Sequence, residues 1–252
     1  MRKVLVLGID GGSLDLIKQW KNDLPNLRVF LENGVYGTLE STLPPLTSPA
    51  WNCMFTGKNP AKIGFYDFFV ISFDENRVRM VNSTYQDSPS IWETLSDFDV
   101  KVGIVNVPST FPPRKVNGFM VCGGMLNALL KDVDYTYPSA LAKELNEVAE
   151  GYEILPLTDL FIEGKETEYF HQFNRVLEKQ VSVVQHLMKT HSWNFFVYVF
   201  FETDSVQHYF WHHMDQHHPK WNPEKSRRYK NSIKDFYVKV DSAIGKLLNG
   251  TP

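Results

Sequence analysis

Three runs of almost unbroken apolar residues constrain the fold more than any other feature of the sequence. They cover residues 4–9, 101–107 and 193–201, and the last is the most apolar segment of strand length in the chain. A strand with one face in water carries polar residues at every second position, and these runs do not. Each run is therefore predicted to be a strand buried on both faces, as in a parallel sheet covered by helices.

Helical patterns separate these runs. Shorter helices are predicted over residues 14–20, 27–32, 50–55, 90–95 and 140–148, further strands over 36–40 and 119–122, and a hairpin within 65–84. Two longer amphipathic helices follow from apolar residues at steps of three and four. Their apolar positions are Phe170, Phe173, Leu177, Val181, Val184 and Met188 in the first, and Ile233, Phe236, Val240, Ile244 and Leu247 in the second.

This alternation of strands and helices predicts an α/β protein with three α/β/α layers and a mostly parallel sheet. Residues 1–124 are expected to form a first part of the core. Residues 125–165 fit the rhythm poorly and are interpreted as an insertion or cap. Residues 166–252 are expected to continue the core.

Composition narrows the class of protein. The net charge of -3 gives no reason to expect binding to a nucleic-acid polymer, and no run of 18 apolar residues exists that would span a membrane. The apolar run near Met1 is too short for a signal peptide. The two cysteines, Cys53 and Cys122, have neither metal-site spacing nor a disulfide framework, which indicates a cytoplasmic protein.

One loop-to-helix junction carries a candidate nucleophile. Residues 43–51 (Leu-Pro-Pro-Leu-Thr-Ser-Pro-Ala-Trp) break the preceding pattern, and an apolar helical run follows. Free backbone N–H groups and the helix dipole favour an anion at such a junction. Thr47 is therefore a candidate nucleophile toward a phosphate ester, and the alternative is that its hydroxyl is only a helix N-cap.

Acidic residues follow two of the apolar runs. Asp10 comes directly after residues 4–9, and Glu202 and Asp204 come after 193–201. Ligands of open α/β sheets bind at the carboxyl ends of strands, so these acids are expected to meet in one crevice. His208 lies four residues beyond Asp204, which places both on one helical face as half of a divalent-metal site. The alternative role for each acid is capping or a salt bridge. Together with Thr47, they favour a metal-dependent site.

Several of these segments resemble the alkaline phosphatase superfamily, and within it the type I phosphodiesterase/nucleotide pyrophosphatase family. The similarity runs through nearly the whole chain. The segments that carry it are residues 8–11 (Gly-Ile-Asp-Gly), 47–49 (Thr-Ser-Pro), 56–64 (Thr-Gly-x-x-Pro-x-x-x-Gly), 108–113 (Pro-Ser-Thr-Phe-Pro-Pro), 117–118 (Asn-Gly) and 202–208 (Glu-x-Asp-x-x-x-His).

The resemblance implies a specific chemistry. Two divalent metal ions, usually zinc and alternatively manganese, would flank the nucleophile, with Asp10 and Thr47 on one ion and Asp204 and His208 on the other. Thr47 would attack the phosphorus of a small phosphodiester or pyrophosphate substrate and form a phosphothreonine that water hydrolyses.

The sequence also departs from the family pattern. Ala50 stands where many relatives carry an asparagine that holds a phosphoryl oxygen, and the Asp-His pair that completes the family's site is missing. The resemblance therefore implies either that these residues are the amino-terminal portion of a longer protein or that the chain is an inactive, truncated member. In both cases the sheet is expected to be incomplete at its carboxyl end. An unpaired edge of that kind would favour self-association into a homo-oligomer. A phosphomutase is a further alternative, whereas a sulfatase is disfavoured because Ser48-Pro49 has no arginine after it.

Five of the eight histidines lie between His208 and His218. Apart from His208, they are expected to form a solvated helix end rather than to contact metal or phosphate.

Overall fold

The core of the protein is a five-stranded, mostly parallel sheet. The computed structural model describes residues 2–72, 76–124, 133–154 and 164–250. The sheet order is β1-β7-β4-β5-β6, and only β6 runs antiparallel to its neighbour. The strands are β1 (Val4–Ile9), β4 (Val102–Pro108), β5 (Gly118–Gly123), β6 (Thr136–Tyr137) and β7 (Phe195–Phe200). This arrangement confirms the predicted fold class.

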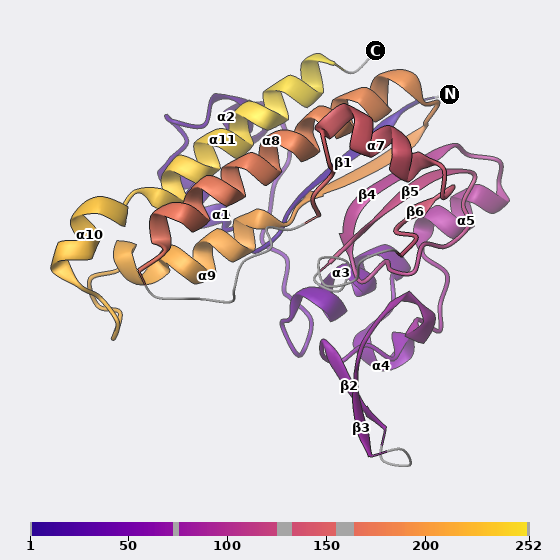
Figure 1. The fold of residues 1–252 in the computed structure, drawn as a ribbon, viewed down its shortest axis with the longest axis horizontal. Helices are drawn as coiled ribbons and strands as arrows, with labels where there is room; N and C mark the ends of the chain where they lie inside the picture. The colour runs from indigo at the N-terminus through magenta and orange to yellow at the C-terminus, as the bar shows by residue number, and fades with distance from the viewer. Residues whose placement is uncertain (1, 73–75, 125–132, 155–163, 251–252) are drawn as a thin grey trace.

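Helices cover both faces of the sheet, which gives three layers (Figure 1). The helices on one face are α1 (Leu14–Gln19), α7 (Leu141–Ala149), α8 (Glu166–Thr190), α9 (Glu202–Met214) and α11 (Ser232–Asn249). The helices on the other face are α3 (Thr47–Thr56) and α5 (Ile91–Asp97). The remaining elements are α2 (Pro25–Asn33), α4 (Pro60–Ile63), η1 (Ser83–Tyr85), α10 (Pro223–Tyr229) and the strands β2 (Phe69–Ser72) and β3 (Arg77–Met80).

Strand β7 shows why the apolar runs predict the sheet so well. Residues 196, 198 and 200 pack into the hydrophobic core beneath α8 and α11, whereas residues 195, 197 and 199 pack into the core beneath α3 and α5. All six residues are buried, so no position of the strand is left for a polar side chain. The continuous run is therefore a direct consequence of helices on both faces.

Most of the predicted elements are present, and one is wrong. Strands β2 and β3 form the expected antiparallel hairpin, which projects from the body of the protein (Figure 1). Its tip, residues 73–75, lies outside the described part of the chain. Residues 36–40, predicted to be a strand, are not in a strand. Leu39 is 90% exposed there, and no strand of the described sheet pairs with this segment, so its β-compatible residues have no partner.

The segment between residues 125 and 165 contributes to the core where it is described. Strand β6 pairs with β5 through Met120 and Tyr137, and helix α7 packs on α8. The parts of this segment at 125–132 and 155–163 lie outside the described residues.

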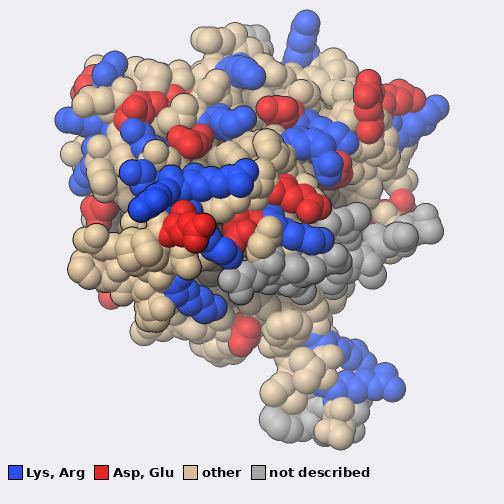
Figure 2. All heavy atoms as spheres, turned by 60° about the vertical axis from the view of Figure 1, so that its left-hand side comes forward, with Lys and Arg blue, Asp and Glu red and all other residues tan. Residues whose placement is uncertain are grey.

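The surface carries mixed charge. On the face in Figure 2, the basic and acidic side chains of the described residues are interspersed. Within the described residues, none of the helices combines the length and the apolar character that crossing a membrane would require.

A buried aspartate of α11 caps helix α2 from a distance. The N-cap of α2, Leu24, makes no side-chain capping bond. Asp241, which is 2% exposed, instead accepts hydrogen bonds from the backbone N–H of Leu27 at 2.7 Å and from the backbone and side-chain nitrogens of Asn26 at 3.2 and 2.9 Å. Because α2 has no local cap of its own, Asp241 satisfies the N–H groups at its start and so joins the two helices.

We expect Asp241→Ala to lower the free energy of unfolding by about 3 kcal/mol, because it leaves buried donors without an acceptor. Urea titration followed by circular dichroism measures the change. The exposed Asp235 of the same helix provides the control, and Asp235→Ala should change the stability by less than about 1 kcal/mol. Equal losses in the two variants would contradict this role of Asp241.

Candidate functional site

The sheet topology brings the acidic residues to one edge. Strands β1 and β7 are adjacent and parallel, with Ile9 opposite Phe200, so both chains leave the sheet side by side. The backbone N–H of Asp10 donates to the Phe200 carbonyl at 3.1 Å, and the Thr203 hydroxyl donates to the Asp10 carbonyl at 2.6 Å. Asp10 is thereby joined to the first turn of α9, which also carries Glu202 and Asp204. This edge is where ligands of open α/β sheets bind.

Asp10 is a buried carboxyl group with one unmet oxygen. It is 5% exposed, and its Oδ1 accepts a hydrogen bond from the indole nitrogen of Trp51 at 2.8 Å. Among the described residues, its Oδ2 has no hydrogen-bond partner. Burial raises the pKa of Asp10 to about 7, with a further increase from the charge of Asp204 and against the lowering effect of the Trp51 bond. Such an oxygen is suited to hold either a proton or a cation.

Two glycines explain how Trp51 and Asp204 come so close to β1. A Cβ atom on Gly8 would lie 2.4 Å from the Trp51 ring, so only glycine lets the indole lie against the strand. Gly11 has a φ of +62°, and a Cβ there would lie 2.8 Å from Oδ1 of Asp204. Residues 8 and 11 must therefore be glycine for steric reasons.

Helix α3 contacts Asp10 through Trp51. Thr47 is its first residue and lies four positions before Trp51, so both side chains lie on the same face of the helix, which contacts Asp10 through Trp51. The N-cap is Leu46, which makes no side-chain capping bond. The interpretation of Thr47 as an N-cap is therefore wrong, and within the described residues no side chain of the N-cap position satisfies the N–H groups at this helix start.

A second contact holds the start of α3 to the sheet. The hydroxyls of Ser48 and Ser109 lie 2.8 Å apart, and Ser109 follows β4 with a φ of +63°. The side chain of Asn52 donates to the Ser48 carbonyl at 2.7 Å. Sequence reasoning gave Ser109 no role, although it belongs to the Pro-Ser-Thr-Phe-Pro-Pro segment and follows a predicted strand. Helix α3 is thus connected to the ends of both β1 and β4.

Asp204 and His208 form a pair on α9. The Nε2 atom of His208 lies 3.3 Å from Oδ2 of Asp204, as the four-residue spacing predicts. The side chain of His208 is 68% exposed and that of Asp204 is 27% exposed. Burial raises the pKa of Asp204, and the charge of His208 opposes this increase.

A buried polar network lies behind this edge, and its members apart from Glu202 were not predicted. Glu202 is 0% exposed and accepts a hydrogen bond at Oε1 from the side-chain nitrogen of Gln180 at 2.8 Å. The Gln180 oxygen accepts in turn from Asn106 at 2.7 Å and from the Tyr198 hydroxyl at 3.1 Å. Oε2 of Glu202 has no partner among the described residues. The sequence feature that could have revealed this network is the presence of polar residues at otherwise apolar positions, namely Asn106 in β4 and Gln180 in α8.

The donors at this edge suit a divalent cation but form pairs rather than a closed cage. Carboxylate and imidazole groups are ligands of zinc and manganese, and the unpaired oxygen of Asp10 fits a cation. Within the described part of the chain, no three His, Cys, Asp or Glu side chains converge closely enough to hold an ion. The fit therefore extends to the pair of Asp204 with His208 and to the unpaired oxygen of Asp10.

The layers and the strand order define a three-layer α/β protein with a mostly parallel sheet. The family model for type I phosphodiesterase/nucleotide pyrophosphatase matches residues 4–252, and the chain belongs to that family. The resemblance inferred from the sequence is thereby confirmed. No curated protein matches the sequence.

Solved structures support the same fold. Phosphonoacetate hydrolase from Sinorhizobium meliloti 1021, in complex with phosphonoformate, is 14% identical with a TM-score of 0.54, and the match covers 96% of this chain and 54% of that one. Murine ectonucleotide pyrophosphatase/phosphodiesterase 5 is 13% identical with a TM-score of 0.55, and the match covers 98% and 52%. An inactive threonine-to-alanine variant of the murine protein, in complex with AMP, is equally similar in fold. The chain thus spans about half the length of these proteins.

The pKa of Glu202 gives a pH dependence to stability. Burial raises it from 4.5 to about 7, with a contribution from the charge of Asp10 and against the hydrogen bond from Gln180. Between these two pH values the unfolded chain releases a proton that the folded protein keeps. The free energy of unfolding therefore falls as the pH rises through this range.

We expect Glu202→Gln, which cannot ionise, to lack that fall. At pH 8 it should be more stable than the wild type by on the order of 3 kcal/mol, and the gap should close toward pH 5. Urea titrations at several pH values in EDTA measure the gap without a contribution from cations at Asp10. Parallel pH profiles for the two proteins would contradict the raised pKa.

Proposed function

We propose that this chain carries a phosphoesterase centre that hydrolyses phosphodiester or pyrophosphate bonds, with Thr47 as the nucleophile. The observation that carries the proposal is the hydrogen bond from Trp51 to Asp10, because it joins α3, whose first residue is Thr47, to the acidic edge of the sheet. Thr47 lies one helical turn before Trp51, on the same face. Membership of the phosphodiesterase/nucleotide pyrophosphatase family supports the reaction class.

A structural neighbour supports the choice of nucleophile. The murine phosphodiesterase variant that is described as inactive carries alanine in place of a threonine, and it holds AMP. In the present chain, Thr47 is the threonine at the start of a helix whose first turn has no side-chain cap. The proposal therefore assigns to Thr47 the role that a threonine has in that neighbour.

The reaction begins with attack of the Thr47 oxygen on phosphorus. The new Thr47–phosphorus bond forms as the bond from phosphorus to the leaving oxygen breaks, and the leaving oxygen takes up a proton. The backbone N–H groups at the start of α3 and the positive end of its dipole stabilise the phosphoryl oxygens. Water then hydrolyses the phosphothreonine and restores the hydroxyl.

Asp10 and Thr47 would hold one divalent ion, and Asp204 and His208 a second, with zinc or manganese as the metal. Bound cations lower the pKa of a hydroxyl and stabilise the charge on the attacking and leaving oxygens. Asp10 must lose its proton to take part, and its pKa of about 7 makes this loss dependent on pH near neutrality. The closeness of Asp204, which raises that pKa, also makes the pair of acids favourable for positive charge.

We expect Thr47→Ala to lower kcat for a chromogenic phosphodiester by at least about a thousandfold, because the covalent step is lost. Thr47→Ser should keep measurable activity. Thr56→Ala at the other end of α3 provides a matched control, since its hydroxyl bonds only to backbone in its own vicinity, and it should keep kcat within about threefold. If Thr47→Ala and the wild type hydrolyse the ester at the same rate, Thr47 is not the nucleophile.

Removal of metal tests the two half-sites. We expect EDTA to abolish hydrolysis and added Zn²⁺ or Mn²⁺ to restore it, and His208→Ala to need at least about tenfold more metal for half-maximal activity. His171→Ala on α8 is the matched control and should leave that metal concentration unchanged. Activity that survives exhaustive chelation would contradict a metal-dependent reaction.

A further inference from the structure

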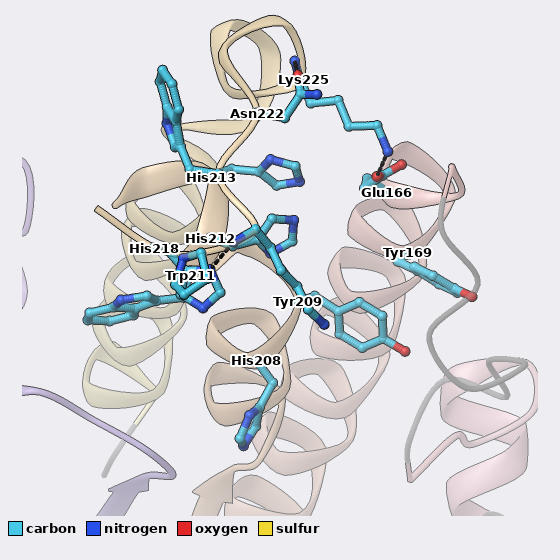
Figure 3. A pocket seen from close by; sticks show the side chains of 13 residues that line it. Glu166, Tyr169, His208, Tyr209, Trp211, His212, His213, His218, Asn222 and Lys225 are labelled. Carbon is cyan, nitrogen blue, oxygen red and sulfur yellow. Dashed lines mark hydrogen bonds and ion pairs between the residues drawn. The ribbon is translucent and has the colours of Figure 1, made fainter. Parts of the chain in front are cut away.

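A pocket of about 700 Å³ lies beside the candidate site. It is formed by α9, the start of α8 and the segment that leads into α10 (Figure 3). His208 lines it together with residues from the second half of α9. The pocket therefore adjoins the half-site made by Asp204 and His208, although the proposed reaction gives its other residues no role.

Basic groups dominate the lining of this pocket. Lys220, Lys225, His212 and His218 all line it, and Glu166 is the one acidic residue in its described lining. Oε1 of Glu166 is already paired with Nζ of Lys225 at 3.0 Å. The charges of His218, Lys220 and Lys225 lower the pKa of His212, after the larger effect of burial. With Lys225 paired to Glu166, the charge of Lys220 is left without an acidic partner in the described lining of the pocket.

Two hydrogen-bond donors in the pocket can be assigned. Nδ1 of His218 accepts from the backbone N–H of Lys220 at 3.1 Å, so a neutral His218 carries its proton on Nε2 and presents a donor there. Lys220 forms no ion pair within the described part of the chain, and the residue is exposed. Both groups are suited to contact an anion.

His213 corrects the prediction that the histidines at this end of α9 are solvated. It is 1% exposed, and neither ring nitrogen has a hydrogen-bond partner among the described residues. Figure 3 shows its ring and that of His212 pointing into the space between α9 and the start of α8. A buried donor without an acceptor is unfavourable, so His213 indicates a ligand group that the protein itself does not supply. Burial, and then the charge of His212, lower its pKa to about 4, so it acts as a neutral imidazole.

Aromatic side chains form the rest of the walls. The rings of Tyr169 and Tyr209 pack with their centroids 4.8 Å apart, and Trp211 and Trp221 are each 38% exposed. Such walls contact the organic part of a ligand while the basic groups hold its charge.

Helix α9 fixes the pocket relative to the candidate site. Asp204, His208 and His212 follow one another at intervals of four residues, so they lie along one face with a rise of about 6 Å per interval. A ligand whose phosphorus lies near Asp204 and His208 would extend its leaving portion along α9 toward His212.

We propose that this pocket binds the anionic group of the leaving portion of the substrate, such as a phosphate or carboxylate carried by the alcohol that is released. The anion-binding property stands on the pocket alone, whereas its assignment to a leaving group rests on the proposed function. A metal site is the other use of clustered imidazoles, and it is disfavoured because no three such side chains converge within the described residues.

Direct binding tests the pocket without catalysis. Inorganic pyrophosphate is titrated into the protein in EDTA, and the histidine ring signals are followed by ¹H–¹³C NMR. We expect saturable shifts in the signals of His212, His213 and His218. We also expect Lys220→Met to raise Kd about tenfold, which corresponds to the loss of about 1.4 kcal/mol of binding.

Lys143→Met, which removes an exposed charge on α7, is the matched control and should leave Kd unchanged. His212→Ala is a second variant that weakens the pocket from another element. No saturable binding, or equal binding by the wild type, Lys220→Met and His212→Ala, would overturn the anion site.

Hydrolysis then tests the assignment to the leaving group. Bis(4-nitrophenyl) phosphate is compared with an analogue whose leaving nitrophenol carries a carboxylate. We expect Lys220→Met to raise KM about tenfold for the carboxylated ester and less than about twofold for the other. Equal changes for the two esters would overturn the assignment. Pyrophosphate binding without hydrolysis of either ester would instead contradict the proposed function and support the anion site.

Discussion

The hydrogen bond between Trp51 and Asp10 is the contact on which the arrangement of the site depends. It joins helix α3 to the end of β1 across 41 residues of sequence. The indole reaches the carboxylate only because residue 8 has no side chain. Since Thr47 lies one turn earlier on the same helix, this contact connects the helix that carries the candidate nucleophile to the acids. The bond between Ser48 and Ser109 then restricts rotation of the helix start about that contact.

The same edge of the sheet carries two buried acids whose hydrogen bonding is incomplete in the described structure. Asp10 and Glu202 are both buried, and each has an oxygen without a partner in the described structure. The charge of Asp204 raises the pKa of Asp10, and the charge of Asp10 raises the pKa of Glu202. Buried carboxyl groups in most proteins are paired, so two such groups at one strand edge are unusual for a purely structural role. Glu202 differs from Asp10 in being held by Gln180 away from solvent. In the proposed function, Glu202 would support the edge from the buried side and Asp10 would be the group that meets a cation.

Sequence patterns predicted those parts of the protein in which the helix or strand that carries a residue also determines its surroundings. Strand β7 was predictable because both of its faces are buried, and the Asp204–His208 pair because helix geometry fixes four-residue neighbours. The prediction of a strand over residues 36–40 was wrong because a strand needs a partner strand, which the local sequence does not specify. The bond from Asn106 to Gln180 spans 74 residues, and the burial of His213 depends on how α9 packs, so neither could be predicted from local pattern.

Helix α9 connects the acidic edge to the basic pocket because one of its faces packs on the protein while the other carries the residues of both regions. Val206 and Phe210 are buried and hold the helix against the body of the protein. Asp204, His208 and His212 lie along the other face, from the acidic edge to the basic pocket. A packed helix keeps a fixed rise per residue, so in the proposed reaction the distance between the phosphorus and the anion site would be set by the backbone rather than by flexible side chains. Selection among substrates would then depend on the length of the leaving group, and the packing of the opposite face would maintain it.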